Sequence, residues 1–405
     1  LHVWRSFYTF INIKQKMKIM FWKKFPVILT AACIYCLLVV TWDTVKYASQ
    51  NTVKELQMKL IEMKLKFGIF PRERVYETDT PHLWPEELPN NDRIIEQIKF
   101  IPPVILNKTI LVSLFEGYKG WDLPNQKAMD NLFTNCPVNN CKAVPDYSAV
   151  NEADAVLFRR MVPQLTSSHH HQIWIFYSLE SPLHSINLES LNGLVNWTAT
   201  YRLDSDIVAP YGKFEKAEVS ILPVDTSRKT KMVAWFVSNC YTSSKRELYV
   251  KQLKEYISVD VYGACSNKRC KKFSSDCENM LDNDYRFYLS FENSLCKDYI
   301  TEKYFHNAME HYIIPVVMGA SKAEYEKVSP PHSFIHVDDF RSPKELAIYL
   351  KKVAQNNTLY NSYFEWKSHY RLINTYFWCR LCSLLNYPKR KVYNDLQNWW
   401  APVCH

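Results

Sequence analysis

The chain has 405 residues, of which 47% are hydrophobic, 15% aromatic and 22% charged. This composition excludes a mainly disordered or low-complexity protein, and the length exceeds that of one ordinary domain. Only 7 residues are glycine, and neither GxGxxG nor the P-loop pattern occurs. We therefore do not expect a nucleotide site built on a glycine-rich phosphate loop.

The net charge of +9 arises partly from lysines clustered over residues 14–24. They are followed by residues 25–42, FPVILTAACIYCLLVVTW, a run of 18 residues without a charge. This length is close to what a helix needs to cross a bilayer, whereas the apolar part of a cleavable signal peptide is shorter. By the positive-inside rule we expect a cytoplasmic tail (1–24), an uncleaved transmembrane signal anchor (25–42) and a lumenal remainder in a type II orientation. The alternative is a buried helix of a soluble protein.

Residues 43–103 are interpreted as a stem or linker. Between residues 53 and 67, apolar residues recur at spacings of three and four, the pattern of a short coiled-coil seam. The stem is thus a candidate homodimer contact, although one amphipathic helix resting on the globular part has the same spacing. Prolines are frequent from residue 71 to residue 103, as is typical of a linker.

Ten cysteines follow the apolar run, and an even number beyond a membrane anchor is typical of disulfides. They are Cys136, Cys141, Cys240, Cys265, Cys270, Cys277, Cys296, Cys379, Cys382 and Cys404. The glycosylation sequons at Asn107, Asn196 and Asn356 agree weakly with a lumenal location.

The first globular block, residues 104–225, contains short apolar runs at 110–115, 155–158 and 173–179. Runs without alternation are expected of strands buried on both faces of a parallel sheet. Glu180 follows the third run directly. Ligands gather at the carboxyl ends of such strands, so Glu180 is a candidate catalytic residue. The alternative is a solvated loop residue without a catalytic role.

The second block, residues 226–375, alternates strands and helices. Strands are expected at 233–237, 259–262, 287–291, 313–318 and 334–337, and helices at 244–256 and 301–311. A further helix begins after Ser342 as N-cap, with Pro343 in its first position. We therefore predict an α/β protein with two facing Rossmann-like domains of mostly parallel sheet.

Polar residues are densest after the strand at 287–291. Asn293, Tyr299, Glu302 and Lys303 lie within eleven residues, at the start of the next helix. Such a corner suits an anionic ligand, because helix N–H groups and ammonium groups neutralise phosphate. Arg246, near the start of a neighbouring helix, offers a guanidinium to the same ligand.

Five segments carry a resemblance to a known family. They are LESP (179–182), NWTATYRLDSDIVAPYG (196–212), AWFVSN (234–239), FYLSFENSLCKDYITEKYFHNA (287–308) and IPVVMG (314–319). The chain resembles the α1,3-fucosyltransferases, which are Golgi type II membrane enzymes of GT-B fold. The resemblance implies inverting transfer of L-fucose from GDP-β-L-fucose to the 3-hydroxyl of GlcNAc.

The resemblance also implies residue roles. Glu180 matches the proposed general base. Arg246 and Lys303 match groups that bind the diphosphate and stabilise the leaving GDP. Asn293, Tyr299 and Glu302 match donor contacts. Arg202 and Asp204 belong to a family signature without an assigned role, and a structural ion pair is an equal explanation.

The acceptor is less defined. NWTATYR, Cys296, the INTYFWCRLC segment (373–382) and the tryptophan pair near residue 400 resemble invertebrate and plant enzymes that act on the core, Asn-linked GlcNAc of N-glycans. Asp206 and Gly212 resemble instead the Lewis-type enzymes, which leaves an antenna or glycolipid GlcNAc as the alternative. An inactive glycan-binding ectodomain is a third reading, against which the intact site residues argue.

The final segment, residues 376–405, is interpreted as a disulfide-bearing tail. Its WCRLC sequence resembles a redox WCxxC, but too few residues follow for a thioredoxin fold, which favours a structural disulfide. No acidic pair is placed for a metal–diphosphate complex, so we expect no obligatory metal. This expectation is compatible with stimulation of the activity by Mn²⁺. Basic residues beyond the anchor are scattered, which excludes a nucleic-acid partner.

Overall fold

The computed structural model describes residues 81–89, 91–145, 148–163, 171–219, 228–270 and 275–404. The expected tail, anchor and coiled-coil seam lie outside these ranges. Across the described ranges, no helix has both the length and the apolar character needed to cross a bilayer.

The first lobe is built on a five-stranded sheet in the order β2-β1-β3-β4-β5, with every neighbouring pair parallel. The strands are β1 (Ile110–Leu114), β2 (Cys141–Val144), β3 (Ala155–Phe158), β4 (Ile173–Ser178) and β5 (Trp197–Thr200). The three expected apolar runs form β1, β3 and β4. They are buried on both faces, as their lack of alternation predicts.

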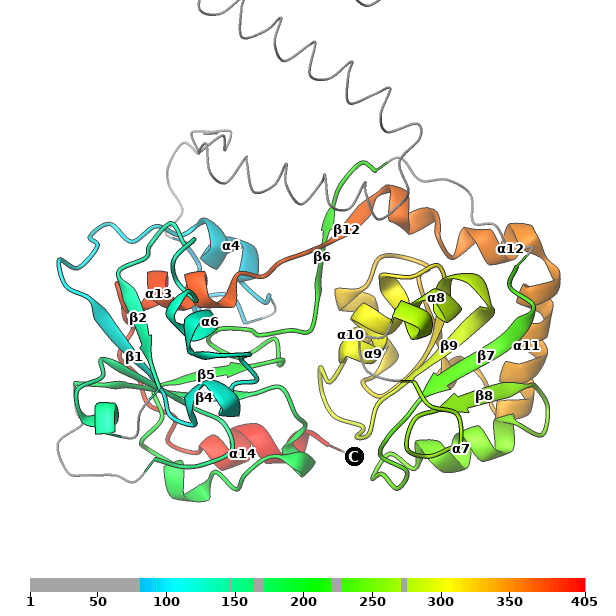
Figure 1. The fold of residues 1–405 in the computed structure, drawn as a ribbon, viewed down its shortest axis with the longest axis horizontal. Coiled ribbons are helices and arrows are strands. Elements are labelled where there is room, and N and C mark those ends of the chain that lie inside the picture. Colours follow the sequence, from blue (N-terminus) through cyan, green and yellow to red (C-terminus); the bar gives the residue numbers. More distant parts are fainter. Residues whose placement is uncertain are drawn as a thin grey trace, which may run out of the picture. The chain divides into compact units, whose positions relative to one another are not determined.

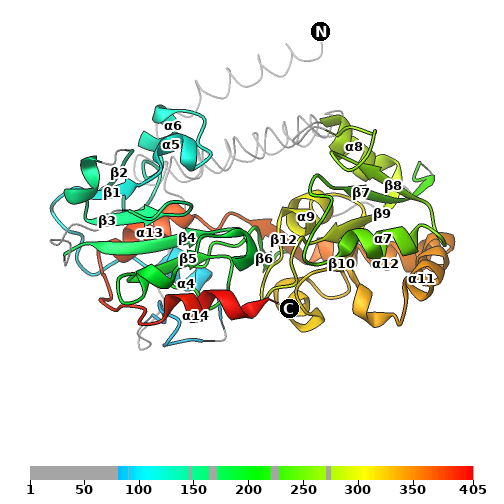
Figure 2. The same ribbon diagram turned by 90° about the horizontal axis from the view of Figure 1, so that it is seen from below.

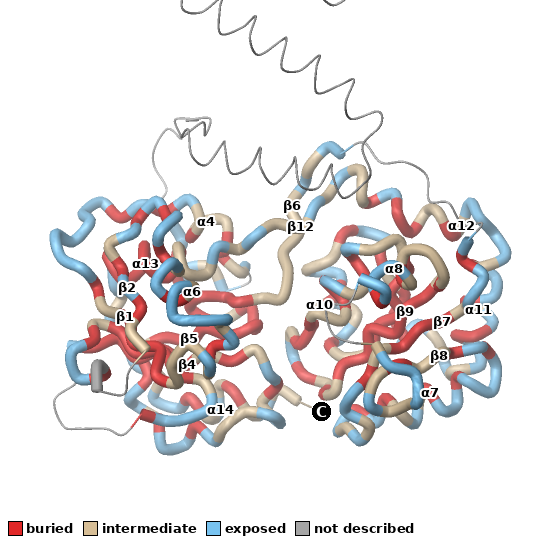
Figure 3. The backbone as a smooth tube through the Cα atoms, in the orientation of Figure 1, coloured by how far each residue is buried: buried red, intermediate tan, exposed pale blue. Residues whose placement is uncertain are grey.

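The second lobe contains another parallel five-stranded sheet, in the order β11-β10-β9-β7-β8. Its strands are β7 (Lys231–Phe236), β8 (Val259–Tyr262), β9 (Tyr285–Phe291), β10 (Ile314–Met318) and β11 (Ile335–His336). All five coincide with expected strands to within a few residues. Figure 3 shows that the strands of both sheets are largely buried.

The two sheets share one topology. Numbered within each lobe, both read 2-1-3-4-5, so the strand order reverses between β1 and β3 and between β7 and β9. In open α/β sheets, ligands bind outside the carboxyl ends of the strands at this reversal. The α/β architecture with two parallel Rossmann-like sheets is confirmed (Figure 1).

Helices flank the sheets. In the first lobe they are α4 (Ile94–Lys99), α5 (Gly117–Gly120), α6 (Gln126–Asp130), α13 (Phe377–Leu385) and α14 (Leu396–Trp400). In the second they are α7 (Arg246–Leu253), α8 (Ser275–Asn283), α9 (Glu302–Tyr304), α10 (Lys322–Val328), α11 (Pro343–Gln355) and α12 (Asn357–Ser362). The cap of α11 is as expected, since the Ser342 hydroxyl accepts a hydrogen bond from Glu345 N at 3.3 Å.

The first lobe extends into the range interpreted as stem. Leu83, Trp84 and Phe100 are buried with the first-sheet core, and Gln97 of α4 donates to the carbonyl of Asp206 at 2.8 Å. Prolines alone therefore do not mark a linker here, because the residues between them pack.

The chain crosses between the lobes twice, and the two crossings pair with each other. β6 (Lys213–Lys216) leads out of the first lobe, β12 (Tyr370–Ile373) leads back, and they form an antiparallel ribbon. After β12, α13 packs into the first-lobe core through Leu381 and Leu384. The second lobe is thus an insertion within the first (Figure 2).

All ten expected cysteines are in disulfides, which confirms that prediction. The pairs are Cys136–Cys379, Cys141–Cys382, Cys240–Cys265, Cys270–Cys277 and Cys296–Cys404. Cys379 and Cys382 of the WCRLC sequence bond to separate partners 243 and 241 residues away. Their role is structural, and they join the returning chain to the first lobe.

Candidate active site

The six predicted site residues follow the carboxyl ends of three strands, either in the loop or in the first turn of the next helix. Glu180 follows β4 of the first lobe. Arg246 opens α7 after β7, and the other four follow β9. Because β7 and β9 flank the strand reversal of the second sheet, five of the six lie where that topology places ligands.

Glu180 is exposed and touches the second lobe. Its Oε2 accepts a hydrogen bond from the hydroxyl of Tyr299 at 3.3 Å. Tyr299 itself is only 2% exposed and packs against Tyr201 of the first lobe, with ring centroids 4.9 Å apart. Burial and the charges of Glu292 and Glu180 raise the pKa of Tyr299, so its hydroxyl stays protonated and donates. The buried ring is placed to orient Glu180.

Two further hydroxyl groups join the same loops. Ser181 Oγ lies 2.9 Å from Ser294 Oγ, and both lie within hydrogen-bond distance of His184 Nδ1, at 3.0 and 3.3 Å. The Ser294 hydroxyl also donates to Asn293 Oδ1 at 3.1 Å. These contacts place Glu180 and Asn293, one from each lobe, on touching loops.

Arg246 is 3% exposed and ties the second-lobe loops together. Its guanidinium donates to the carbonyl oxygens of Phe291 at 2.6 Å and Asn239 at 3.1 Å, while Nε has no protein partner among the described residues. Burial lowers the pKa of Arg246, and the nearby Glu292 carboxylate opposes that shift.

Lys303 sits among three acceptors. Its Nζ lies 3.0 Å from Glu292 Oε2, 3.2 Å from Glu302 Oε1 and 2.8 Å from Thr301 Oγ1. Burial alone would lower the pKa of Lys303, but the carboxylates of Glu292 and Glu302 raise it above its ordinary value. Burial opposes ionisation of Glu302 as well, yet Lys303 holds the pKa of that carboxyl below its usual range. The ammonium group is therefore fixed before any ligand arrives.

Glu292, which directly follows β9, completes this cluster and is not among the site residues predicted from the sequence. It is 0% exposed and accepts from the backbone N–H of Thr301 at 2.9 Å, as well as from Lys303. Burial raises the pKa of Glu292, with Lys303 opposing. A Cβ on Gly319 would lie 2.7 Å from Glu292 Cγ, so the glycine ending IPVVMG leaves room for this side chain.

Arg202 and Asp204 form the structural ion pair that the sequence analysis considered. The two groups are 2.6 Å apart, and the guanidinium lies 4.1 Å from the Trp399 ring centroid. Burial acts to raise the pKa of Asp204, but Arg202 and Lys297 together hold it below its ordinary value. Neither side chain contacts a predicted site residue through a described hydrogen bond.

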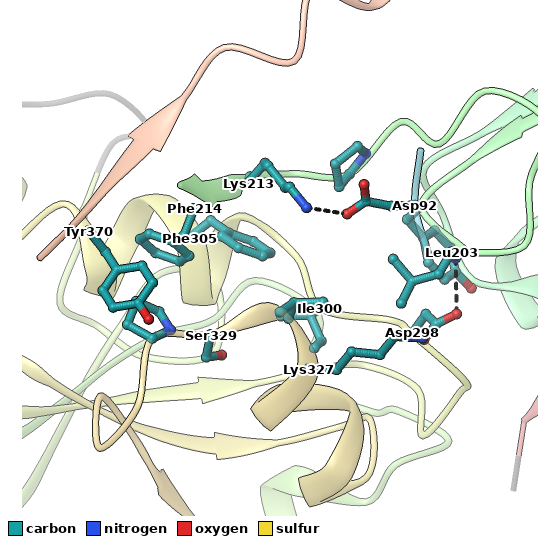
Figure 4. A pocket seen from close by; sticks show the side chains of 15 residues that line it. Asp92, Leu203, Lys213, Phe214, Asp298, Ile300, Phe305, Lys327, Ser329 and Tyr370 are labelled. Carbon is teal, nitrogen blue, oxygen red and sulfur yellow. Dashed lines mark hydrogen bonds and ion pairs between the residues drawn. The ribbon is translucent and has the colours of Figure 1, made fainter. Parts of the chain in front are cut away.

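A cavity of about 250 Å³ lies beside the β6–β12 ribbon (Figure 4). Phe214, Phe305 and Tyr370 line it together with Lys213, whose ammonium pairs with Asp92 at 2.5 Å. None of the six predicted site residues lines this cavity. Since chemistry rather than volume locates a reaction, we place the candidate active site at the touching loops of Glu180 and Asn293.

Within the part of the chain that the structure describes, no group of three or more His, Cys, Asp or Glu side chains is arranged to hold a metal ion. The fixed positive charge of the site comes from Arg246 and Lys303.

Two family profiles match the chain. The profile "Fucosyltransferase, N-terminal" matches residues 107–212, and "Glycosyltransferase family 10 (fucosyltransferase) C-term" matches residues 226–399. Glycoprotein 3-alpha-L-fucosyltransferase A of Drosophila melanogaster is 42% identical over 340 residues, which cover 79% of this chain and 67% of that protein.

A human 4-galactosyl-N-acetylglucosaminide 3-alpha-L-fucosyltransferase is 40% identical over 266 residues, covering 62% of this chain and 70% of the relative. A crystal structure of an α1,3-fucosyltransferase with GDP-fucose superposes with a TM-score of 0.49 at 15% identity, covering 76% of this chain and 98% of that one. On the sequence matches, the chain belongs to the α1,3-fucosyltransferases of glycosyltransferase family 10.

Proposed function

We propose that the protein transfers L-fucose from GDP-β-L-fucose to the 3-hydroxyl of a GlcNAc, with inversion at the anomeric carbon. One observation carries the proposal: an exposed carboxylate of the first lobe touches the second-lobe loop that follows β9, where fixed cations flank the strand reversal. In this proposal the base that activates the acceptor and the site for a sugar diphosphate are adjacent.

In the proposed reaction, the oxygen of the acceptor hydroxyl attacks C1 of fucose, and Glu180 accepts the proton of that hydroxyl. The bond from C1 to the diphosphate oxygen breaks, and GDP leaves with that electron pair. Arg246 and Lys303 stabilise the negative charge that develops on the diphosphate. Asn293 and Glu302 bind the donor, with Glu302 assigned to the fucose hydroxyls.

For the acceptor we favour the core, Asn-linked GlcNAc of N-glycans. The sequence features shared with core-type enzymes support this choice, as does the Drosophila relative, whose name specifies glycoproteins. The human relative, named for galactosyl-GlcNAc acceptors, supports the antenna alternative. We further propose a Golgi location, with membrane anchoring through residues 25–42 and dimer contacts through the stem.

The acceptor is tested directly with the full chain and GDP-fucose. Core-exposed N-glycans and N-acetyllactosamine are offered as paired acceptors, and mass spectrometry locates the new fucose. Fucose on the Asn-linked GlcNAc is the expected result. Fucose only on lactosamine would replace the core assignment with the antenna one, and transfer to neither would contradict the proposed activity.

Glu180→Gln tests the mechanism. The amide keeps the shape but cannot take a proton, so we expect kcat to fall by about 10²-fold or more while GDP binding changes little. Glu189→Gln, at an exposed glutamate of the same lobe, is the matched control and should retain kcat. Wild-type turnover in Glu180→Gln would reject the general-base role.

A further inference from the structure

The C-terminal strap, residues 387–404, runs along the first lobe and ends on the second. Tyr393 makes backbone hydrogen bonds with Gly193 and Val195, at 2.7 and 2.9 Å, and its hydroxyl donates to the buried Asp206 at 2.9 Å. The amide of Asn196 donates to the carbonyl of Lys391 at 2.8 Å. These contacts bind the start of the strap to the first lobe.

The middle of the strap is held by its tryptophans. Trp400 is 1% exposed, donates through Nε1 to Ser185 Oγ at 2.7 Å, and lies 5.7 Å from the Tyr201 ring. Trp399 stacks on the Arg202 guanidinium, and its carbonyl accepts from that group. Figure 2 shows α14, in red, beside the first-lobe strands.

The end of the strap is bonded to the second-lobe loop that carries the site residues. Cys404 forms a disulfide with Cys296, and Lys297 N donates to the carbonyl of Val403 at 2.9 Å. Cys296 is 2% exposed and belongs to the same buried cluster as Tyr299 and Trp400. A covalent link thus joins a first-lobe anchor to the loop three residues before Tyr299.

We propose that the C-terminal strap positions the general base: through the Cys296–Cys404 bridge it holds Tyr299 where its hydroxyl orients Glu180. Tyr299 is then a positioning residue in addition to any contact with the donor. The inference rests on the proposed function, because it assigns a partner to the base of that reaction. Asp298, which accepts from Leu203 N at 3.0 Å, is a second tie on the same loop. Opening the Cys296–Cys404 bridge should therefore lower kcat only in part, because Asp298 still ties the loop to the first lobe.

The test is a double-mutant cycle in the full chain. One variant opens the bridge, Cys296→Ala with Cys404→Ala; another removes only the hydroxyl, Tyr299→Phe; a third combines them. We expect kcat to fall by about tenfold in Tyr299→Phe, by less than that in the bridge variant, and by no more than about tenfold in the combined variant, because both changes act on one hydrogen bond. Activity is normalised to the fraction that binds GDP, so misfolded protein does not count.

The matched control is Cys270→Ala with Cys277→Ala, a bridge confined to the second lobe, which should retain kcat. Wild-type kcat in the strap variant or in Tyr299→Phe would overturn the inference, and so would a combined loss equal to the product of the two. If the strap variant does not fold, reductant is titrated into wild-type protein. The loss of kcat should then follow alkylation of Cys296 and Cys404. A loss of kcat that follows alkylation of Cys270 instead would overturn the inference.

Glu180→Gln is measured in parallel to separate the two hypotheses. If that variant keeps wild-type turnover, the proposed function fails at its base. If it loses turnover while the strap variants do not, only the positioning role fails.

Discussion

The contacts of Lys303 hold its ammonium group in one position. Glu292, Glu302 and Thr301 occupy the three N–H groups of the ammonium, so Lys303 must exchange one of these partners for a phosphate oxygen when a diphosphate binds. Lys303 is recognisable in the sequence by its motif. The role of Glu292 is not, because its carboxylate is buried and nothing in one sequence distinguishes a buried strand-end glutamate from a solvated one.

Lys303→Met should weaken donor binding and slow transfer together, lowering kcat/KM for GDP-fucose by about 10²-fold. It should also change the pH dependence of stability. The pKa of Glu292 is already raised above its ordinary 4.5, so its contribution to stability is present below that pH and lost as pH rises through the folded value. Removing the cation raises the folded value further, so the unfolding free energy of the variant should fall more steeply above pH 4.5 than that of wild type.

Denaturant unfolding over a pH series, together with initial rates, checks both expectations. Lys231→Met is the matched control, because the Lys231–Asp284 pair is 45% and 39% exposed and such pairs contribute little. An unchanged response of the Lys303 variant to GDP-fucose would contradict its phosphate role. If the unfolding free energies of the Lys303 variant and of wild type depend on pH in the same way, the role of Lys303 beside Glu292 is contradicted.

Most strands of the two sheets were predictable from their apolar residues, whereas the edge strand β2 was not. β2, with the sequence CKAV, alternates buried and exposed residues at the sheet edge and is only four residues long. The expected helix at 301–311 is present but changes character, since α9 passes into a π-helical turn at Phe305–Met309. Such a change depends on packing around Tyr304 and Phe305, which local propensity does not encode.

The α11 cap gives a prediction at this scale. Ser342→Ala removes the acceptor for Glu345 N and should lower the unfolding free energy by about 1 kcal/mol. Ser342→Asp keeps an acceptor and should stay near wild type. Thermal unfolding of the three proteins measures the difference. Equal midpoints for Ala and wild type would mean that solvent replaces the cap without cost.

The predicted domains follow one another along the chain. In the structure, by contrast, α13 follows the second lobe in sequence but packs in the core of the first lobe. The α/β class and both sheets followed from local patterns. The association of α13 with the first lobe did not, because Cys379 and Cys382 find partners more than 240 residues earlier. Pairing over that distance leaves no local periodicity, and ten cysteines permit many connectivities.

This insertion has a consequence for biosynthesis. As the ribosome delivers the chain, residues 228–362 of the second lobe emerge as one continuous stretch and can assemble at once. The first lobe must wait for α13, which completes its core only after the whole of the second lobe has been synthesised. Until then the native partners of Cys136 and Cys141 have not been synthesised, so the native oxidation of the first lobe cannot finish before α13 emerges.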